Sequence, residues 1–462
     1  MELNPEDVEI DPVRSKLETN IAKDPGIKHY EIYFSISSEL SLEMEKGSMK
    51  KSTTSKDVGF GIRVANDQGQ SAFSNASAFD ADSIQKTVRN VVSLMEKSTP
   101  DEDFQTFAKK SSISQIQSKY LFDKEIECLN IENAVNFMAD TLEDAEKIQD
   151  ARVYSINVDF GAGNETVYIL NSNGVDVSEN YTAISATCSV TVKDGGEMSS
   201  DYEYKVGRSL DQVSPGIGML AVEKALKTLE KVHVKTEFYP TILSQRAAAR
   251  LIGLSFARAA NGELMQQGLS FLHDNLGQEI GPGFLSVVDD GQMTSNSRIN
   301  TRSFDSEGFK TDKKAIINAG KFETGLHNSY TANKANIEST GNARRTGYNS
   351  PPAIGASNVI IEVDTGNMGS FEELLSCVKR GIYFDETFDS PNYATGDFSG
   401  MISLGFLIED GEITKPISQA AFGIHLLELL NSIKMCGDDP KDNGGIIAPS
   451  ILLEGLHVSG SL

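Results

Sequence analysis

The side chains that could carry catalysis are scattered along this chain of 462 residues. Many zinc enzymes hold the metal with two histidines placed close together on one helix, and no two histidines here have such a spacing. A metal site would therefore have to be assembled from distant residues. The six histidines are His29, His233, His273, His327, His425 and His457.

Two acids and two arginines stand out among the other polar residues. Asp305 and Glu307 are two positions apart, so on a strand they would share one face, and paired carboxylates can do acid/base work. A solvated turn is the alternative. Arg344 and Arg345 lie in the segment 332–357, which is rich in Asn, Gly, Ser and Pro. Such a segment is either a binding loop or lid on a rigid scaffold, or a mobile surface loop.

Other enzyme signatures are absent or fail in their context. The sequence has neither a G-x-S-x-G elbow nor a P-loop. The run from Gly216 to Ala221 matches a G-x-G-x-x-A dinucleotide pattern, but Ser214-Pro215 precedes it where that fold needs a strand. Pro215 instead favours a helix start. The residues by themselves predict a multidomain protein without a visible catalytic set.

The elements that would position these residues begin with two similar units, each made of several strands, a turn and a helix. Alternating apolar residues predict the strands, and Asp80 and Pro215 begin the two helices, the second running over 215–229. The polar stretch 98–119 between the units resembles a linker. The predicted strands are 30–36, 41–45, 58–64 and 72–74 in the first unit and 153–160, 166–171, 182–192 and 200–204 in the second.

From residue 238 the pattern changes to one helix followed by hairpins. Ser244 is placed to cap that helix. A capping box at Ser370 and Glu373 predicts a later helix that ends before Gly381 and buries Cys377. Three turn pairs lie between apolar runs, a strong hairpin signal: Asp290-Gly291, Ala319-Gly320 and Asp410-Gly411.

These patterns predict an α+β fold. Its N-terminal part consists of two related strand-strand-strand-helix units, residues 1–115 and 116–236. A β-rich domain with hairpins and a few helices follows at 237–462.

The net charge of the chain limits the classes of partner that it can bind. It carries 42 Lys and Arg against 66 Asp and Glu, a net charge of −24, which repels phosphate backbones and anionic lipid. We therefore expect neither nucleic acid nor a membrane as partner. The four cysteines show no disulfide framework or metal spacing, which indicates reduced thiols. Since no targeting segment or apolar run of ~20 residues is evident, we expect a cytoplasmic protein.

Several separated stretches, in the same order, resemble the PmbA/TldD family of peptidase-related proteins, also described as modulators of DNA gyrase. The resemblance covers the chain from about His29 to the C-terminus, and it implies an α+β N-terminal part and a β-rich C-terminal domain. The most specific stretches are Val58-Gly-Phe-Gly-Ile-Arg-Val64, Phe304-Asp-Ser-Glu-Gly-Phe309, 316–325, Glu338-Ser-Thr-Gly-Asn-Ala343, Ala394-Thr-Gly-Asp-Phe-Ser399, 405–413 and 451–460.

The same resemblance indicates which branch of the family this chain is similar to. The TldD-like branch carries a His-Glu-x-x-x-His zinc motif in the helix near the start of the C-terminal domain, and the PmbA-like (TldE) branch lacks it. Here that place reads Ser244-Gln245-Arg246-Ala247-Ala248-Ala249. Ser244, Gln245 and Ala249 thus occupy the motif positions, and they offer neither imidazole for zinc nor a carboxylate to polarise water. The cysteine that the catalytic branch carries near its C-terminus is also missing from 443–450.

The resemblance therefore implies a PmbA/TldE-type subunit without a metal of its own. It would pair with a TldD-like metalloprotease, in which zinc is expected, and help it process unfolded peptides. One alternative is a metal-independent peptidase that uses Asp305, Glu307, Arg344 and Arg345 as its polar site. Another is a homodimeric peptide-binding or scaffold protein without a protease partner. The physiological substrate is left open by the sequence.

Overall fold

The computed structural model describes residues 9–460, and its N-terminal half is built on one long antiparallel sheet with the strand order β3-β2-β1-β4-β5-β6. Each unit supplies three strands, and the units join where β1 pairs with β4. The predicted α+β class is confirmed, while the boundaries at 115 and 236 stay predictions. The strands are β1 (His29–Glu45), β2 (Ser48–Ala65), β3 (Ser71–Ala76), β4 (Val153–Asn171), β5 (Asp176–Asp194) and β6 (Glu197–Gly207).

The strands are longer than their sequence signals. The predicted pieces 30–36 and 41–45 form the single strand β1, because β2 and β4 continue to pair with it through the polar residues between them. The predicted pieces 153–160 and 166–171 likewise belong to β4. Ladder hydrogen bonds from both neighbours thus carry a strand through a stretch whose side-chain pattern is broken.

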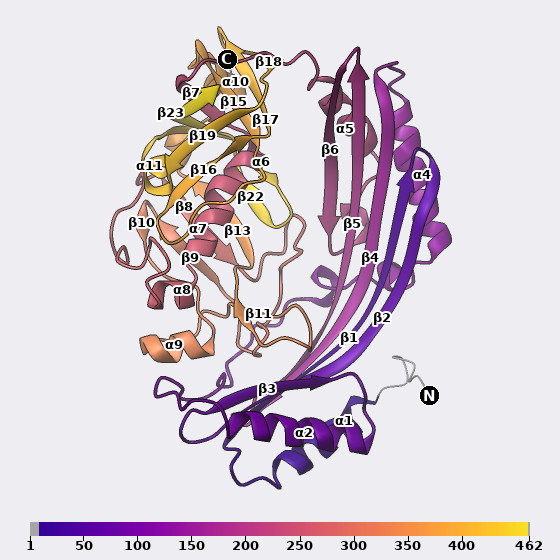
Figure 1. Ribbon diagram of the computed structural model, residues 1–462, viewed down its shortest axis with the longest axis vertical. Helices are drawn as coiled ribbons and strands as arrows, with labels where there is room; N and C mark the ends of the chain where they lie inside the picture. Colours follow the sequence, from indigo (N-terminus) through magenta and orange to yellow (C-terminus); the bar gives the residue numbers. More distant parts are fainter. Residues whose placement is uncertain (1–8, 461–462) are drawn as a thin grey trace.

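Four helices cover one face of this sheet, two at each end (Figure 1). Ile32 and Phe34 of β1 pack against the first pair, and Leu40 and Leu42 pack against the second. Asp80 caps its helix as predicted, accepting bonds from the N–H groups of residues 82 and 83. The helices are α1 (Ile10–Ile21) and α2 (Ala81–Met95), then α4 (Ile131–Glu146) and α5 (Ile217–Leu226), with short turns at η2 (Ser118–Tyr120), α3 (Lys124–Glu127) and η3 (Leu210–Gln212).

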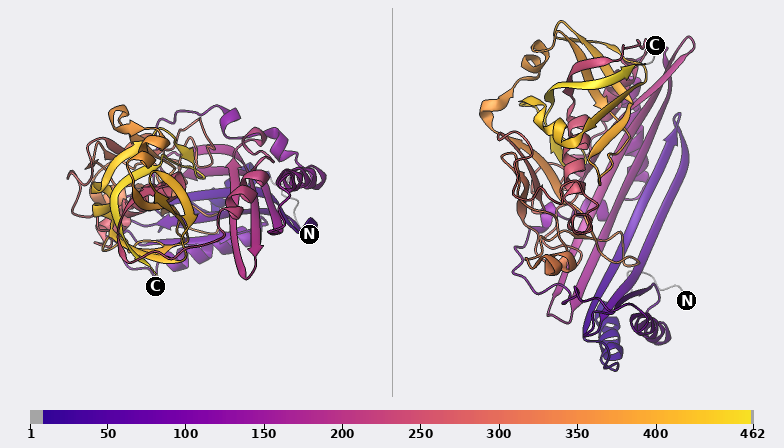
Figure 2. Two further views of the ribbon diagram at one scale, coloured as in Figure 1. Left: turned by 90° about the horizontal axis from the view of Figure 1, so that it is seen from above. Right: turned by 60° about the vertical axis from the view of Figure 1, so that its left-hand side comes forward.

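The C-terminal domain lies along the opposite face of the sheet (Figure 2). One of its sheets has the order β10-β9-β8-β13-β22-β21. Its strands are β8 (Leu285–Asp290), β9 (Lys313–Asn318), β10 (Lys321–Phe322), β13 (Asn358–Val363), β21 (Lys441–Asp442) and β22 (Ile446–Ala448). A two-stranded sheet pairs β11 (Ala343–Arg344) with β12 (Ala353–Ile354).

A second, nine-stranded sheet completes the domain in the order β14-β20-β23-β7-β15-β17-β18, with β19 on β23 and β16 on β19. Its strands are β7 (Glu237–Leu243), β14 (Met368–Gly369), β15 (Arg380–Glu386), β16 (Asp397–Ile402), β17 (Leu404–Glu409), β18 (Glu412–Pro416), β19 (Ala420–His425), β20 (Ile433–Gly437) and β23 (Ile451–Gly460). The domain's helices are α6 (Gln245–Ala248), η4 (Ala249–Leu254), α7 (Ser255–Ala259), α8 (Gly262–Gln266), α9 (Ser329–Ala335), η5 (Thr365–Asn367), α10 (Phe371–Ser376) and α11 (Leu426–Asn431).

The continuous helix α6-η4-α7 is the centre of this domain. Ala248, Leu251, Ile252 and Phe256 are fully buried on it and belong to one apolar cluster with residues of both sheets. Ser244 caps the helix as predicted, because its side chain accepts a bond from the backbone N–H of residue 247. No helix in residues 9–460 has the length and hydropathy needed to cross a bilayer.

Two of the three predicted hairpin turns are confirmed. Ala319-Gly320 joins β9 to β10 and Asp410-Gly411 joins β17 to β18, and all four residues have positive φ, as a two-residue type I′ turn requires. The prediction at Asp290-Gly291 is wrong. Strand β8 ends there, but it pairs with β9 only after the excursion 291–312. That excursion carries Asp305 and Glu307.

The capping box at Ser370 and Glu373 is confirmed, but its helix is shorter than predicted. The helix ends at Ser376, and Arg380 already begins β15. Cys377, predicted to be buried, is exposed. At Arg380 and Gly381 the backbone pairs with β17, and from Ile382 onward it also pairs with β7; these ladders outweigh the local preference for helix.

The glycines of the Val58–Val64 stretch allow a loop of the C-terminal domain to lie on β2. A Cβ at Gly59 would overlap the ring of Tyr348, and a Cβ at Gly61 would overlap the carbonyl oxygen of the same residue. The Tyr348 hydroxyl donates to the Asp57 carboxylate at 3.0 Å. Gly at these positions is therefore a packing requirement.

We expect Gly61→Ala to lower the free energy of unfolding by about 1–3 kcal/mol, because the added methyl group forces the Tyr348 backbone away from the sheet. Urea unfolding followed by fluorescence would measure it. Gly196→Ala is the matched control, since a Cβ there meets nothing within 4 Å. Equal stability of the two variants would contradict the packing argument.

Candidate functional site

A cavity of about 500 Å³ lies at the free edge of β6, where the N-terminal sheet meets the C-terminal domain. Strand β6 contributes Asp201, Glu203 and Tyr204, and helix α5 with its C-cap contributes Lys224 and Lys227. The elements that enclose it, namely α5, α6, β6, β15, β17 and β18, all lie in the upper part of Figure 1. The cavity is thus built from both halves of the chain. Its C-terminal wall consists of Gln245, Arg246, Phe371, Tyr383, Asp385, Leu404, Phe406, Ile413, Thr414, Lys441, Asp442 and Asn443.

Arg246 occupies the end of this cavity next to α6, among three carboxylates. Its guanidinium forms an ion pair with Asp385, lies 3.3 Å from Glu386 and 3.6 Å from Asp201, and stacks 5.2 Å from the centre of the Tyr202 ring. Burial raises the pKa of Asp201 and of Glu386 above their ordinary values, against the opposing effect of Arg246. One cation therefore pairs with three acids, of which Asp201 and Glu386 are buried.

The three positions of the zinc motif have distinct surroundings. Ser244 is buried, accepts the Ala247 N–H and donates to the Asp385 carbonyl oxygen at 3.1 Å. Gln245 lines the cavity and donates to the Asp439 carboxylate at 2.6 Å. Ala249 is buried in the apolar core. The helix then widens into the π-helix η4, a rare geometry that is frequent at functional sites.

These residues do not fit a zinc ion. A hydroxyl used as a helix cap, an amide bonded to Asp439 and a methyl group supply none of the thiolate, imidazole or carboxylate donors that zinc takes. The guanidinium of Arg246 adds a fixed positive charge at the same place. Within residues 9–460, no three His, Cys, Asp or Glu side chains are grouped so that they could hold a metal ion.

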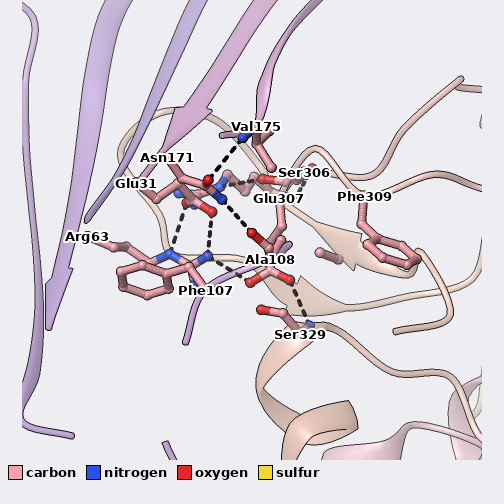
Figure 3. Close-up of polar contacts among 12 residues, drawn as sticks. Glu31, Arg63, Phe107, Ala108, Asn171, Val175, Ser306, Glu307, Phe309 and Ser329 are labelled. Carbon is pink, nitrogen blue, oxygen red and sulfur yellow. Dashed lines mark hydrogen bonds and ion pairs between the residues drawn. The ribbon is translucent and has the colours of Figure 1, made fainter. Parts of the chain in front are cut away.

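The other predicted site residues lie away from this cavity, in a buried network that joins the sheet to the C-terminal domain (Figure 3). Arg63 of β2 donates to Glu31 of β1 at 2.9 and 2.6 Å and to Glu307 at 2.7 Å. The second oxygen of Glu307 accepts the Ser329 N–H at 2.8 Å. Arg345 pairs with Glu31 from the other side. The two acids and the Arg345 side chain are at most 1% exposed.

Asp305 organises the backbone around this network. Its carboxylate accepts the N–H groups of Glu307, Phe309 and Ala343 at 2.9 to 3.0 Å. Arg344 donates to the Ala343 carbonyl oxygen and to the Ser357 hydroxyl. The solvated turn weighed for Asp305 and Glu307 is therefore wrong, because both acids are buried. Glu307 and Arg345 pair with residues of the N-terminal sheet, whereas Asp305 and Arg344 bond within the C-terminal domain. Their role as a polar peptide site stays a prediction.

The pKa values of Asp305 and Glu307 are shifted in opposite directions. Burial, aided by the Glu307 carboxylate, raises the pKa of Asp305 to about 7. Burial acts in the same direction on Glu307, but the charge of Arg63 and the hydrogen bonds from Arg63 and Ser329 together outweigh it and hold the pKa of Glu307 below its ordinary value. Since the folded chain binds the Asp305 proton more tightly than the unfolded chain does, this group stabilises the fold at low pH, and that contribution is lost as the pH rises toward 7.

We expect Asp305→Asn to flatten the decline in stability between pH 4 and 7, because an amide does not titrate. The measurement is the urea midpoint of the wild type and the variant across this range. Asp312→Asn, a change at an exposed acid of the same excursion, should keep the wild-type slope. If the Asp305→Asn profile ran parallel to the wild type, Asp305 would not be the group that titrates.

Sequence reasoning missed the acids that surround Arg246. Asp201, Asp385 and Glu386 belong to β6 and β15, whose acids look like ordinary solvated positions in an acidic chain. Arg63, in the Val58–Val64 stretch, carried a usable signal, since a charged residue inside an apolar strand needs a partner. Its partner Glu307 is 244 positions away, so only the fold brings them together.

Comparisons with known proteins match three consecutive parts of the chain to one family. The family model PmbA/TldA metallopeptidase domain 1 matches residues 30–94, the central domain matches 124–229, and the C-terminal domain matches 236–460.

Curated relatives named PmbA and curated relatives named TldD are both similar to this chain. An uncharacterized protein of Methanocaldococcus jannaschii is 28% identical over 92% of this chain and 95% of its own length. The metalloprotease PmbA of Escherichia coli O157:H7 is 28% identical over 63% of this chain and 61% of its own length. A metalloprotease TldD homolog of Buchnera aphidicola is 23% identical over 94% of this chain and 92% of its own length.

Solved structures share the fold. A putative modulator of a DNA gyrase from Thermotoga maritima superposes with a TM-score of 0.86 at 24% identity, covering 98% of this chain and all of that one. TldE from Thermococcus kodakarensis gives a TM-score of 0.85 at 21% identity, covering 98% of this chain and 99% of its own.

Proposed function

Because the chain belongs to the PmbA/TldD metallopeptidase family, we propose that it is a subunit without a catalytic metal that pairs with a TldD-like metalloprotease and helps it process peptides. In this proposal the zinc and the hydrolytic step belong to the partner. This chain contributes the scaffold and a surface that receives peptide. We propose the cytoplasm as the place where the pair acts.

The observation that carries the proposal is the chemistry around Arg246. In the helix where the catalytic branch would carry its zinc motif, this chain has the Ser244 hydroxyl, which caps the helix, and the Gln245 amide, which is bonded to Asp439. Beside them is the Arg246 guanidinium, which three acids hold. The guanidinium is always charged and repels a second cation from the same place. The scaffold around it is nevertheless complete, with a central helix, two sheets and a cavity of about 500 Å³. A retained scaffold with a replaced donor set suits a partner subunit better than an independent protease.

The sequence identities to the relatives are consistent with the PmbA-like (TldE) branch. Those named PmbA are 28% identical to the chain, while those named TldD are 22 or 23% identical. Both kinds are named metalloproteases, so their names leave open which member of a pair would carry the metal.

The experiment is co-expression of this chain with its nearest relative that carries a His-Glu-x-x-x-His helix. Size-exclusion chromatography, elemental analysis and cleavage of an unfolded peptide are measured on this chain alone, on the relative alone and on the mixture. We expect an equimolar complex, and we expect cleavage only where the relative is present, with the mixture faster than the relative alone. The control is the same complex with the motif glutamate of the relative changed to glutamine.

Two results would overturn the proposal. Stoichiometric zinc and cleavage by this chain alone would make it a peptidase in its own right. Self-association with no affinity for the relative would favour a homodimeric binding protein.

A further inference from the structure

The edge of β6 inside the cavity has its backbone donors already occupied. Asp201 folds back and accepts the N–H of Tyr202 at 2.7 Å, and Glu203 accepts the N–H of Tyr204 at 3.2 Å. A peptide adding to this edge as a further strand would need those donors. The acids therefore block strand addition here, as charged side chains do on many natural edge strands. A ligand of this cavity must be held through its side chains and its ends.

The two acids also mark two poles of opposite charge. Around Asp201, the cation Arg246 is shared with Asp385 and Glu386, so negative charge is in excess. One oxygen of Asp385 binds Arg246, and the other has no hydrogen-bond partner in the described part of the chain. Asp385 lines the cavity and is 16% exposed. This end is suited to an ammonium group.

Positive charge is in excess at the Glu203 pole. Lys224 binds Glu203 at 2.6 Å, Lys441 lies 3.4 Å from the same carboxylate, and Lys227 also lines the cavity. The second acid there, Asp442, is already used by the backbone N–H groups of residues 297 and 445. Lys441 is 44% exposed, and Lys227 has no ion-pair partner among the described residues. This end is suited to a carboxylate.

An aromatic row forms part of the cavity wall. The Tyr383 ring lies 5.8 Å from that of Phe371 and 6.3 Å from that of Phe406, measured between centroids. Leu404 and Ile413 extend this apolar surface, and all five residues line the cavity. A ligand between the poles would thus place an apolar side chain against this wall.

The spacing of Asp201 and Glu203, one at each pole, indicates the length of the ligand. Asp201 and Glu203 are two residues apart on one strand, which puts their Cα atoms about 7 Å apart. Two residues of extended peptide also span about 7 Å between their termini. We propose that this cavity binds a free dipeptide or tripeptide with an apolar side chain, its amino group at Asp385 and its carboxylate at Lys227 and Lys441. The inference rests on the proposed role in peptide processing for its meaning, since such a ligand is the product of peptide hydrolysis.

The test is isothermal titration of the full chain, without any partner, with leucyl-phenylalanine. We expect one dipeptide per chain. Acetylating its amino group or amidating its carboxylate should each weaken binding about tenfold or more, because each change removes one charged hydrogen-bond partner. Diglycine, which has both termini but no apolar side chain, should also bind at least about tenfold more weakly. These ligand changes leave the fold untouched.

Protein variants locate the site. In Lys441→Met, amidating the dipeptide should weaken binding less than in the wild type, because a group that binds the carboxylate is gone. In Asp385→Asn, acetylating the dipeptide should likewise weaken binding less, because the group that binds the ammonium is gone. Lys16→Met, on the exposed surface of α1 at the far end of the sheet (Figure 1), should bind like the wild type. No binding at millimolar dipeptide, equal binding of the blocked dipeptides, or unchanged penalties in both variants would each overturn the inference.

Failure here is distinguishable from failure of the proposed function. If the dipeptide does not bind but a zinc-bearing relative still forms an active complex with this chain, only the cavity inference falls. If the dipeptide binds as described but no such complex forms, the cavity inference stands and the partner role falls.

Discussion

Replacing Arg63 by methionine is expected to lower the free energy of unfolding by about 3–5 kcal/mol, the cost of removing one partner from a buried ion pair. Arg63 is the cation between Glu31 and Glu307, and it stacks 4.6 Å from the centre of the Phe107 ring. Methionine retains much of its apolar stem but leaves Glu307 with no cationic partner. Arg345 still pairs with Glu31. Urea unfolding at pH 7, followed by fluorescence and circular dichroism, measures the loss.

The loss should have two further properties if the network joins the two halves of the chain. Adding Glu307→Gln to Arg63→Met should recover part of it, because the uncompensated charge is then gone. Arg152→Met, which breaks an exposed pair with Asp150 inside one turn, should leave the midpoint almost unchanged. A stability of Arg63→Met equal to that of Arg152→Met would show that the network adds little to the joining of the domains.

The class of the fold and most of its turns follow from local chemistry. Asp80, Ser244 and Ser370 cap the helices that they were predicted to cap, because capping depends on a few neighbouring residues. Ala319-Gly320 and Asp410-Gly411 form the predicted hairpins because Gly, the second residue of each pair, adopts positive φ without strain. Helix α4 was not predicted, and its burial against β4 and α5 is a tertiary effect. Local patterns therefore predict caps and tight turns better than the extent of an element.

The candidate site could be predicted only in part, since its residues come from distant segments. The sequence pointed to the stretch at Ser244, Gln245 and Ala249, and Gln245 does line the cavity. The decisive contacts there are made by Arg246 with Asp201 and Asp385, which lie 45 and 139 positions from it in the chain and belong to different layers. The acid pair Asp305 and Glu307 was the most visible polar pattern. Glu307 makes a buried contact with Arg63 of the N-terminal sheet, whereas Asp305 holds the backbone of its own segment, and spacing alone cannot separate such roles from acid/base work.

Replacing Arg246 by methionine is expected to make stability depend strongly on pH. In the wild type, burial raises the pKa of Asp201 and Glu386 while Arg246 opposes that rise. Without the cation both pKa values rise further. A carboxyl whose pKa is higher in the folded than in the unfolded chain stabilises the fold when protonated, and this stabilisation is lost as the pH increases. The variant should therefore be close to the wild type near pH 5 and about 3–5 kcal/mol less stable near pH 8.

Arg250→Met separates this charge effect from the loss of an arginine on the same helix. Within residues 9–460, the Arg250 guanidinium donates only to the carbonyl oxygens of Phe388 and Asp389, so its removal should cost the same stability at every pH. Urea midpoints of both variants from pH 5 to 8 make the comparison, and Asp385→Asn added to Arg246→Met should restore part of the loss at high pH. Parallel profiles for the two arginine variants would mean that the three acids are not held by Arg246. The guanidinium could not then be the fixed charge that distinguishes this helix from a zinc-binding one.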